Sequence, residues 1–135
     1  MQEKWIEAWS DGAAGPETVT GAFAGGEWMP SVNGHNVLVF DVLLASTIAA
    51  TYLEAQIHWS PDGGTTVLGP LDVENIVSGG VVEIQDMVIR HMSTADGHHT
   101  ISVRDLIQGA AYRIQLRQVG GTAVTALVYA YFGVV

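Results

Sequence analysis

The chain contains no cysteine and little positive charge. The absence of cysteine excludes a disulfide framework, a thiolate metal site and a thiol nucleophile. Fourteen acidic residues stand against five basic ones, Lys4 is the only lysine, and the formal net charge is −9. A phosphate backbone is bound by clustered lysine and arginine, which this chain lacks, so we expect no nucleic-acid partner.

Sustained helical periodicity is also missing, and residues 73–77 offer one helical turn at most. The chain instead has strand-like runs separated by turns about every 8–12 residues, a pattern typical of sandwiches and barrels. We therefore expect one all-β domain of antiparallel strands over residues 36–135. Residues 1–35, rich in glycine, alanine and tryptophan, predict an extended N-terminal arm with short strands.

The signals of a secretory leader and of a membrane anchor are weak or absent. The N-terminus has no basic region followed by an apolar stretch. Residues 118–135 carry no charge, but Gly120-Gly121 stand near the start of the run, and its β-branched and aromatic content suits a strand better than a membrane span. We expect synthesis in a cytoplasm and no membrane partner.

The last quarter of the chain holds two strand-like runs that meet at Gly120-Gly121. Alternation over residues 111–117 predicts a strand with one wet face, and the glycine pair predicts a two-residue hairpin turn. Residues 124–132 are apolar on both faces, so we expect a second copy of the chain to cover one of them. The expected oligomer interface comprises Leu127, Tyr129, Tyr131, Arg113 and Arg117.

The middle of the chain predicts a meander. An apolar run at 37–45 and an alternating run at 51–59 indicate two strands, and a turn at 61–64 leads into a short returning strand at 65–68. A loop over 72–80 precedes one long strand at 81–92, with a bulge near Asp86 where the apolar phase shifts. A polar turn at 93–99 and a short strand at 100–103 follow.

Three tryptophans mark the arm. Trp5, Trp9 and Trp28 lie in a segment with little periodicity. A buried indole contributes a large apolar area, so these residues are expected to pin the arm onto a sheet or a neighbouring subunit. Completion of the chain's own core is an equally good interpretation.

The segment Ser60-Pro-Asp-Gly-Gly-Thr-Thr66 fits the spacing of an Asp-box, Ser-x-Asp-x-Gly-x-Thr, except that Val67 replaces the usual aromatic residue. The Asp62 carboxylate and the Ser60 and Thr66 hydroxyls can bond turn amides, and Gly64 allows left-handed backbone. The pattern predicts a structural turn and gives no evidence for glycosidase activity.

No catalytic or metal-binding constellation emerges. Asp96, His98 and His99 form the only cluster with ligand chemistry, yet adjacent histidines on a strand point to opposite faces. The other histidines are isolated, and we expect surface or interface positions for them (His35, His58 and His91). Four carboxylates sit where a glycosidase pair is possible, but nothing singles out two of them (Asp41, Glu54, Glu83 and Asp86). We interpret Asp41 and Asp86 as partners of arginines, and we expect no enzyme activity and no cofactor.

Residues 57–66 (IHWSPDGGTT) and 112–122 (YRIQLRQVGGT), with a strand ending near Arg90 between them, resemble small β-sandwich virion proteins of tailed bacteriophages. Capsid decoration, or cement, proteins are the nearest group, and the resemblance spans roughly residues 36–132. It implies a jelly-roll sandwich that forms a homotrimer on the outer surface of the phage head. There it would tie neighbouring subunits of the major capsid protein together, and the arm would reach onto the shell.

Two other functions share this fold. Related hairpins occur in tail and neck proteins, and a carbohydrate-binding or receptor-binding module would use exposed aromatic residues such as Trp59 or Trp28. A small glycosidase is the least favoured interpretation because it requires a carboxylate pair.

Overall fold

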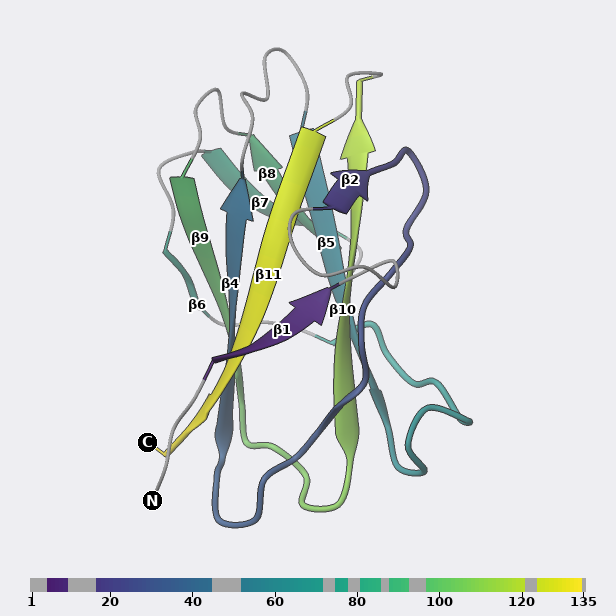
Figure 1. The fold of residues 1–135 in the computed structure, drawn as a ribbon, viewed down its shortest axis with the longest axis vertical. Helices are drawn as coiled ribbons and strands as arrows, with labels where there is room; N and C mark the ends of the chain where they lie inside the picture. The colour runs from purple at the N-terminus through teal and green to yellow at the C-terminus, as the bar shows by residue number, and fades with distance from the viewer. Residues whose placement is uncertain are drawn as a thin grey trace.

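The computed structural model describes residues 5–9, 17–44, 52–71, 75–77, 81–85, 88–92, 97–120 and 124–134. Over these residues the chain forms two antiparallel sheets that pack face to face, and no helix is present (Figure 1). No helix in the described part is therefore available to cross a membrane. The all-β prediction is confirmed.

The first sheet has β11 (Val124–Gly133) near its centre. The strand order is β1 (Trp5–Trp9), β11, β4 (Val37–Leu44), β9 (Gly97–Arg104) and β6 (Asn75–Val77), and β2 (Glu17–Val19) also pairs with β11. The second sheet runs β3 (Met29–Pro30), β10 (Ala111–Val119), β5 (Tyr52–Ser60), β8 (Val88–Met92) and β7 (Val81–Gln85).

The order of the strands is that of a jelly roll. The chain crosses between the sheets at each step from β3 to β4, β5, β6 and β7, and again from β8 to β9, β10 and β11. Strands β1/β2, β11, β4 and β9 thus face β3, β10, β5 and β8, while β6 and β7 widen one edge. The expected antiparallel, jelly-roll-like sandwich is confirmed.

The core lies between the sheets, where alternate residues of each strand point inward. β4 contributes Leu38, Phe40 and Val42, and β10 contributes Ile114 and Leu116, all at most 1% exposed. β11 contributes two small residues, one branched residue and one large aromatic residue to the core (Ala126, Ala130, Val128 and Phe132). This packing explains one of the two apolar faces of β11.

The predicted terminal hairpin is wrong. β10 pairs with β3 and β5, whereas β11 pairs with β1, β2 and β4 in the other sheet. Gly120 has φ 121°, so the glycine is used to let the chain leave β10, not to fold it back. Alternation identified β10 and a two-sided apolar run identified β11, but neither pattern carries information on strand partners.

Three other local predictions are corrected. The expected long strand at 81–92 is a hairpin, because β7 and β8 pair antiparallel with Gln85 opposite Val88. The proposed bulge near Asp86 falls on residues 86–87, outside the described residues, which link these two strands. The loop at 72–80 contains β6, which pairs with β9, and β9 begins at Gly97 inside the expected turn.

Residues 1–35 contribute three short strands to the sheets. β1 and β2 pair with β11, and β3 pairs with β10. Val19 is 0% and Met29 6% exposed, so both belong to the core formed by residues 36–134. Between β2 and β3 the chain runs along β10, where the Gln118 amide donates to the Thr20 carbonyl (Figure 1).

Candidate functional site

The Asp-box turn forms a closed hydrogen-bond network after β5. The buried Ser60 hydroxyl donates to Asp62 Oδ1 at 2.7 Å and accepts from the Gly64 amide at 2.8 Å. Thr66 donates its amide to Asp62 Oδ1 at 2.7 Å and its hydroxyl to Asp62 Oδ2 at 2.6 Å. The spacing in the sequence thus brings Ser60, Asp62, Gly64 and Thr66 together as a structural turn.

These bonds stabilise the ionised form of Asp62. The hydroxyl and amide of Thr66, followed by the hydroxyl of Ser60, lower the pKa of Asp62 from 3.8 to about 2. The turn therefore carries a full negative charge at neutral pH. All of these donors belong to the turn itself, so the Asp62 carboxylate stabilises the conformation of this loop.

Trp28 lies between this turn and β10. The Arg113 guanidinium carbon is 4.5 Å from the centroid of the Trp28 ring, a cation–π contact. On the turn, a Cβ added to Gly64 would lie 2.6 Å from Trp28 Nε1. Trp28, expected to clamp the arm onto a shell, thus contacts Arg113 and Gly64 of its own chain. The side chains of Trp5 and Trp9 lie outside the described residues, and their backbone pairs with Tyr131 and Val128.

The outer face of the second sheet is polar. Cross-strand pairs place Arg113 opposite His58, Gln115 opposite Gln56 and Arg117 opposite Glu54. Arg117 Nε donates to Glu54 Oε1 at 2.7 Å, and the Arg117 guanidinium carbon lies 4.3 Å from the Phe23 ring centroid. The Glu54 side chain is only 4% exposed, whereas the Arg117 side chain is 37% exposed, so a buried carboxylate is paired with a partly exposed guanidinium.

His58 shares this polar face. Its Nε2 lies 3.3 Å from Gln56 Nε2, and its pKa is lowered first by burial and then by the charge of Arg113. The same burial lowers the pKa of Arg113 itself. His58 Nδ1 has no hydrogen-bond partner among the described residues and its Nε2 faces Gln56, so no described carboxylate bonds to this ring.

The outer face of the first sheet is apolar along β11 and β4. Leu127, Tyr129 and Tyr131 point away from the core and are partly exposed, as are Val39 and Leu43 on β4. The register places Leu127 opposite Leu43 and Tyr131 opposite Val39, and between these two apolar pairs it places Tyr129 opposite Asp41. We call Leu127, Tyr129, Tyr131, Val39 and Leu43 the β11 face, and Asp41 lies among them.

The structure does not bring all five predicted interface residues together. Leu127, Tyr129 and Tyr131 share the β11 face, but Arg113 and Arg117 lie on the outer face of the other sheet. The separation follows from the corrected partners of β10 and β11. The two arginines instead hold Trp28 and Phe23, contacts within the chain.

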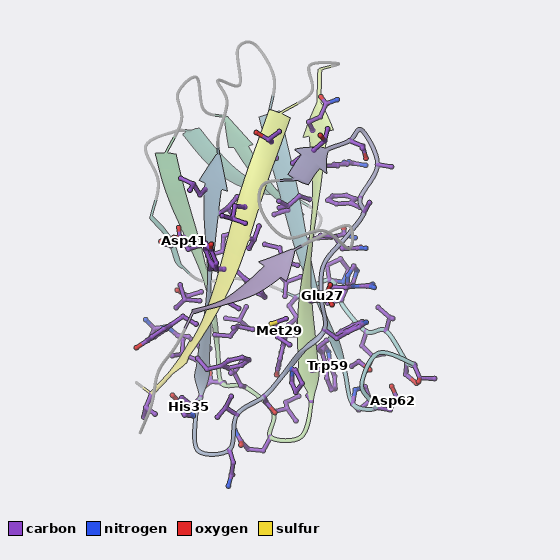
Figure 2. The ribbon with its side chains drawn as sticks, in the orientation of Figure 1. Glu27, Met29, His35, Asp41, Trp59 and Asp62 are labelled. Carbon is purple, nitrogen blue, oxygen red and sulfur yellow. The ribbon has the colours of Figure 1, made fainter. Side chains whose placement is uncertain are left out.

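A small cavity opens at the lower end of the sandwich beside Trp59. Its volume is about 130 Å³, and it is lined by Trp59, Leu71, Val103, Arg104, Asp105, Ile107 and Tyr112. The Ile107 amide donates to Tyr112 Oη at 2.8 Å, which fixes the phenol at the cavity wall, and burial raises the pKa of Tyr112. Figure 2 shows Trp59 and Asp62 on the same side of this end.

The sequence analysis did not predict the burial of His35 or the ion pair between Glu54 and Arg117. His35, expected at a surface or interface, is only 3% exposed, and neither ring nitrogen has a hydrogen-bond partner among the described residues. Figure 2 shows it at the base of β4. No sequence signal distinguishes a buried histidine in a loop, whereas Glu54 and Arg117 could have been paired had the register of β5 and β10 been known.

Of the four candidate carboxylates, only the side chains of Asp41 and Glu54 are described, and these two lie on opposite outer faces of the sandwich; Asp86 lies outside the described residues. Asp41 lies opposite Tyr129 on the outer face of the first sheet, and Glu54 lies on the outer face of the second. The Glu83 backbone is opposite Arg90, and the side chains of both, like those of His91, His98 and His99, lie outside the described residues. Among the side chains that are described, no three acidic or histidine groups gather to hold a metal ion.

With the fold and these surfaces defined, the chain was compared with known proteins. No family model, curated protein or solved structure matches it.

Proposed function

We propose that this chain is a structural virion protein of a tailed bacteriophage. It decorates the outer surface of the head, self-associates as a homotrimer and stabilises the shell of major capsid protein. The proposal combines the resemblance of residues 57–66 and 112–122 to decoration proteins with the jelly-roll strand order. The observation that carries it is the apolar β11 face.

The contrast between the two outer faces supports self-association. In a sandwich exposed to water on both sides, each outer face is expected to be polar, as the second sheet is with its Arg, Glu, Gln and His pairs. The β11 face instead carries two tyrosines, two leucines and a valine. Interface cores are enriched in aromatic residues and depleted in lysine, and the only lysine of this chain is Lys4.

Light scattering on the purified chain tests this assembly. We expect a trimer for the wild type, and dissociation to monomers for Leu127→Asp and Tyr129→Asp, because each places a charge in the apolar contact. The milder Leu127→Ser and Tyr129→Ser serve if the charged variants unfold, as judged by circular dichroism.

The matched control is Ile107→Asp. Ile107 is an apolar residue that is 50% exposed in the β9–β10 loop, away from the β11 face, so this variant should keep the wild-type mass. A folded, monomeric wild type would overturn the proposed self-association.

Attachment to the head has a separate test. An antibody raised against the chain should label the heads, and not the tails, of intact particles of the encoding phage in electron micrographs. Labelling of tail or neck would favour the corresponding alternative location, and absence of label from purified particles would contradict a virion protein.

The cavity beside Trp59 supports a second candidate function, carbohydrate binding. Trp59 lines this cavity together with Arg104 and Asp105, a set that offers an aromatic ring and hydrogen-bonding groups. Trp28 offers less, because Arg113 covers its ring. A glycan array probed with the labelled chain tests this function, and an array without hits would count against it.

A further inference from the structure

Arg113 forms no ion pair with any carboxylate that the structure describes. Its side chain is partly exposed on the outer face of the second sheet, and its Nε is buried without a hydrogen-bond partner among the described residues. Burial also lowers the pKa of Arg113, because the guanidinium loses hydration there. The chain has fourteen acidic residues, so the state of Arg113 does not reflect a shortage of carboxylates.

Arg117, on the same face of β10, provides an internal comparison. An aromatic ring covers each guanidinium, with the guanidinium carbon 4.3 Å from the ring centroid at Arg117 and 4.5 Å at Arg113. Arg117 lies opposite Glu54 and donates to its carboxylate at 2.7 Å, whereas Arg113 lies opposite His58. The two positions therefore share the strand, the face and the aromatic cover, and differ in the carboxylate.

His58 supplies a second hydrogen-bonding group beside Arg113. Its Nε2 lies 3.3 Å from the Gln56 amide nitrogen, which can only donate, so the proton of the neutral ring is on Nδ1. That Nδ1 is buried and has no partner among the described residues. Burial lowers the pKa of His58 and the charge of Arg113 lowers it further, because the two groups repel each other as cations. We call Arg113, His58, Gln56 and Trp28 the Arg113 cluster.

The terminal nitrogens of Arg113 are the part of this cluster that a ligand can reach. They make no hydrogen bond to a described residue and, unlike Nε, they are not buried. Their N–H groups form the fixed planar fork that matches the two oxygens of a carboxylate. An anion bound there would also offset the repulsion between Arg113 and His58.

The charge of the chain favours a carboxylate over a phosphate group. A phosphate monoester carries about −1.5 to −2 charges at neutral pH, whereas a carboxylate carries one. A chain with a net charge of −9 repels the more highly charged group more strongly, and the cluster offers one guanidinium to compensate.

We infer that the Arg113 cluster binds a carboxylate group supplied from outside the chain. This carboxylate stands to Arg113 as Glu54 stands to Arg117. An acidic side chain of a partner protein and a free carboxylic acid share this chemistry. The inference goes beyond the proposed function, which rests on the β11 face of the other sheet.

Nuclear magnetic resonance titration with sodium acetate tests the site. The comparison probes are acetamide, which has the same shape without the charge, and inorganic phosphate, all at constant ionic strength. We expect acetate alone to shift the Trp28 indole and His58 ring signals saturably. The titration of His58 should move to higher pH in acetate, because a bound anion stabilises the imidazolium. Acetate shifts no larger than those with acetamide, or tighter binding of phosphate, would overturn the inference.

A peptide pair distinguishes the two sources of the carboxylate. The probes are acetyl-Ala-Glu-Ala-amide and its neutral counterpart acetyl-Ala-Gln-Ala-amide. Binding of the acidic peptide more tightly than acetate would assign the site to a partner protein, and binding equal to that of acetate would assign it to a small acid. Equal binding of the two peptides would contradict recognition of a carboxylate.

Three variants localise the effect. Arg113→Gln should weaken acetate binding about tenfold, because it removes a charged donor. Gln115→Met, a matched change on the same face of β10, should leave it unchanged. His58→Glu places a carboxylate opposite Arg113 within the chain, so it should raise the thermal midpoint and remove the response to acetate. Retention of acetate binding at wild-type strength in His58→Glu would overturn the inference, even if Arg113→Gln fails to fold.

These outcomes are independent of the self-association test. The acetate titration reads the outer face of the second sheet, and light scattering reads the β11 face of the first. A trimer that ignores acetate would refute the carboxylate site alone, and a monomer that binds acetate would refute only the trimer.

Discussion

Gly63 and Gly64 are adjacent glycines with positive φ angles of 77° and 118°, but only one of them is also sterically constrained. A Cβ at Gly63 would meet nothing within 4 Å, whereas one at Gly64 would lie 2.6 Å from Trp28 Nε1. The Trp28 ring is in turn held by Arg113. The Trp28 ring thus packs so closely on Gly64 that the Asp-box turn and the segment before β3 are sterically coupled.

Gly64→Ala should therefore destabilise the protein more than Gly63→Ala. The left-handed backbone costs an alanine about 1 kcal/mol at either position, and the clash adds the loss of the Trp28–Arg113 contact, about 0.5–1 kcal/mol. Urea unfolding of the two variants measures the difference, and the Trp28 indole signal should move in Gly64→Ala alone. Equal stabilities would contradict this coupling.

Asp62 gives the turn a defined dependence on pH. Its pKa in the folded protein is below the unfolded value, so the stabilisation is fully present above pH 3.8 and is lost as the pH falls toward 2. The thermal midpoint of Asp62→Asn should lie below that of the wild type at neutral pH, and the gap should close near pH 2. A carboxyl titration of Asp62 by magnetic resonance gives the pKa directly; an ordinary value near 3.8 would refute the network.

At the scale of elements, β5 and β10 are joined by a side-chain ion pair as well as by backbone hydrogen bonds. Arg117 is anchored on Glu54 and covered by Phe23, which ties the chain between β2 and β3 to the sheet. Gln115, two residues earlier on the same face, makes only a 3.4 Å bond to the Gly25 carbonyl. The ion pair is therefore the stronger of the two attachments.

We expect Arg117→Met to cost about 1–2 kcal/mol of unfolding free energy, because it removes a charge-assisted bond from a buried carboxylate, discounted for the partial exposure of the arginine. Gln115→Met, the matched change on the same face, should cost less than about 0.5 kcal/mol. Amide exchange should also quicken at Gln118, whose amide bonds Thr20. Similar losses in both variants would argue against a special role for the pair.

The strands could be predicted from the pattern of apolar residues, but their partners could not. The alternating runs at 51–59 and 111–117 appear as β5 and β10, and the dense apolar run at 37–45 appears as β4. The prediction of a terminal hairpin was wrong because a glycine pair is compatible both with a turn between neighbouring strands of one sheet and with a connection between two sheets. The β7–β8 hairpin was missed because its turn lacks the glycine or asparagine signals that mark most tight hairpins.

Among the candidate sites, too, local features could be predicted from the sequence and long-range contacts could not. The Asp-box was predictable because its bonds join residues at most four positions apart, such as Thr66 to Asp62. The Glu54–Arg117 pair and the loop contact beside the buried His35 join residues 63 and 73 positions apart, and the cavity beside Trp59 joins segments around residues 59–71 and 103–112. Residue spacing along the sequence cannot predict contacts that depend on which strands pair and in which register.

At the scale of the whole molecule, decoration is expected to act by linking many weak contacts. A trimer that touches several shell subunits gains avidity, so the shell resists the pressure of packaged DNA although each contact is weak. Particles stripped of this protein should release DNA at a lower temperature, as followed with an intercalating dye, and added wild-type protein should restore the original value. Unchanged release on stripping would count against a stabilising role.

The position of β11 also has a consequence for biosynthesis. This strand lies between β1 and β4 in the first sheet, yet it is the last strand of the sequence. Until the ribosome has delivered residues 124–133, β1 and β2 lack the strand that pairs with them, and one edge of β4 stays open although β9 pairs with the other. We therefore expect the first sheet to form completely only after these residues have been synthesised, and an open strand edge before that point favours aggregation.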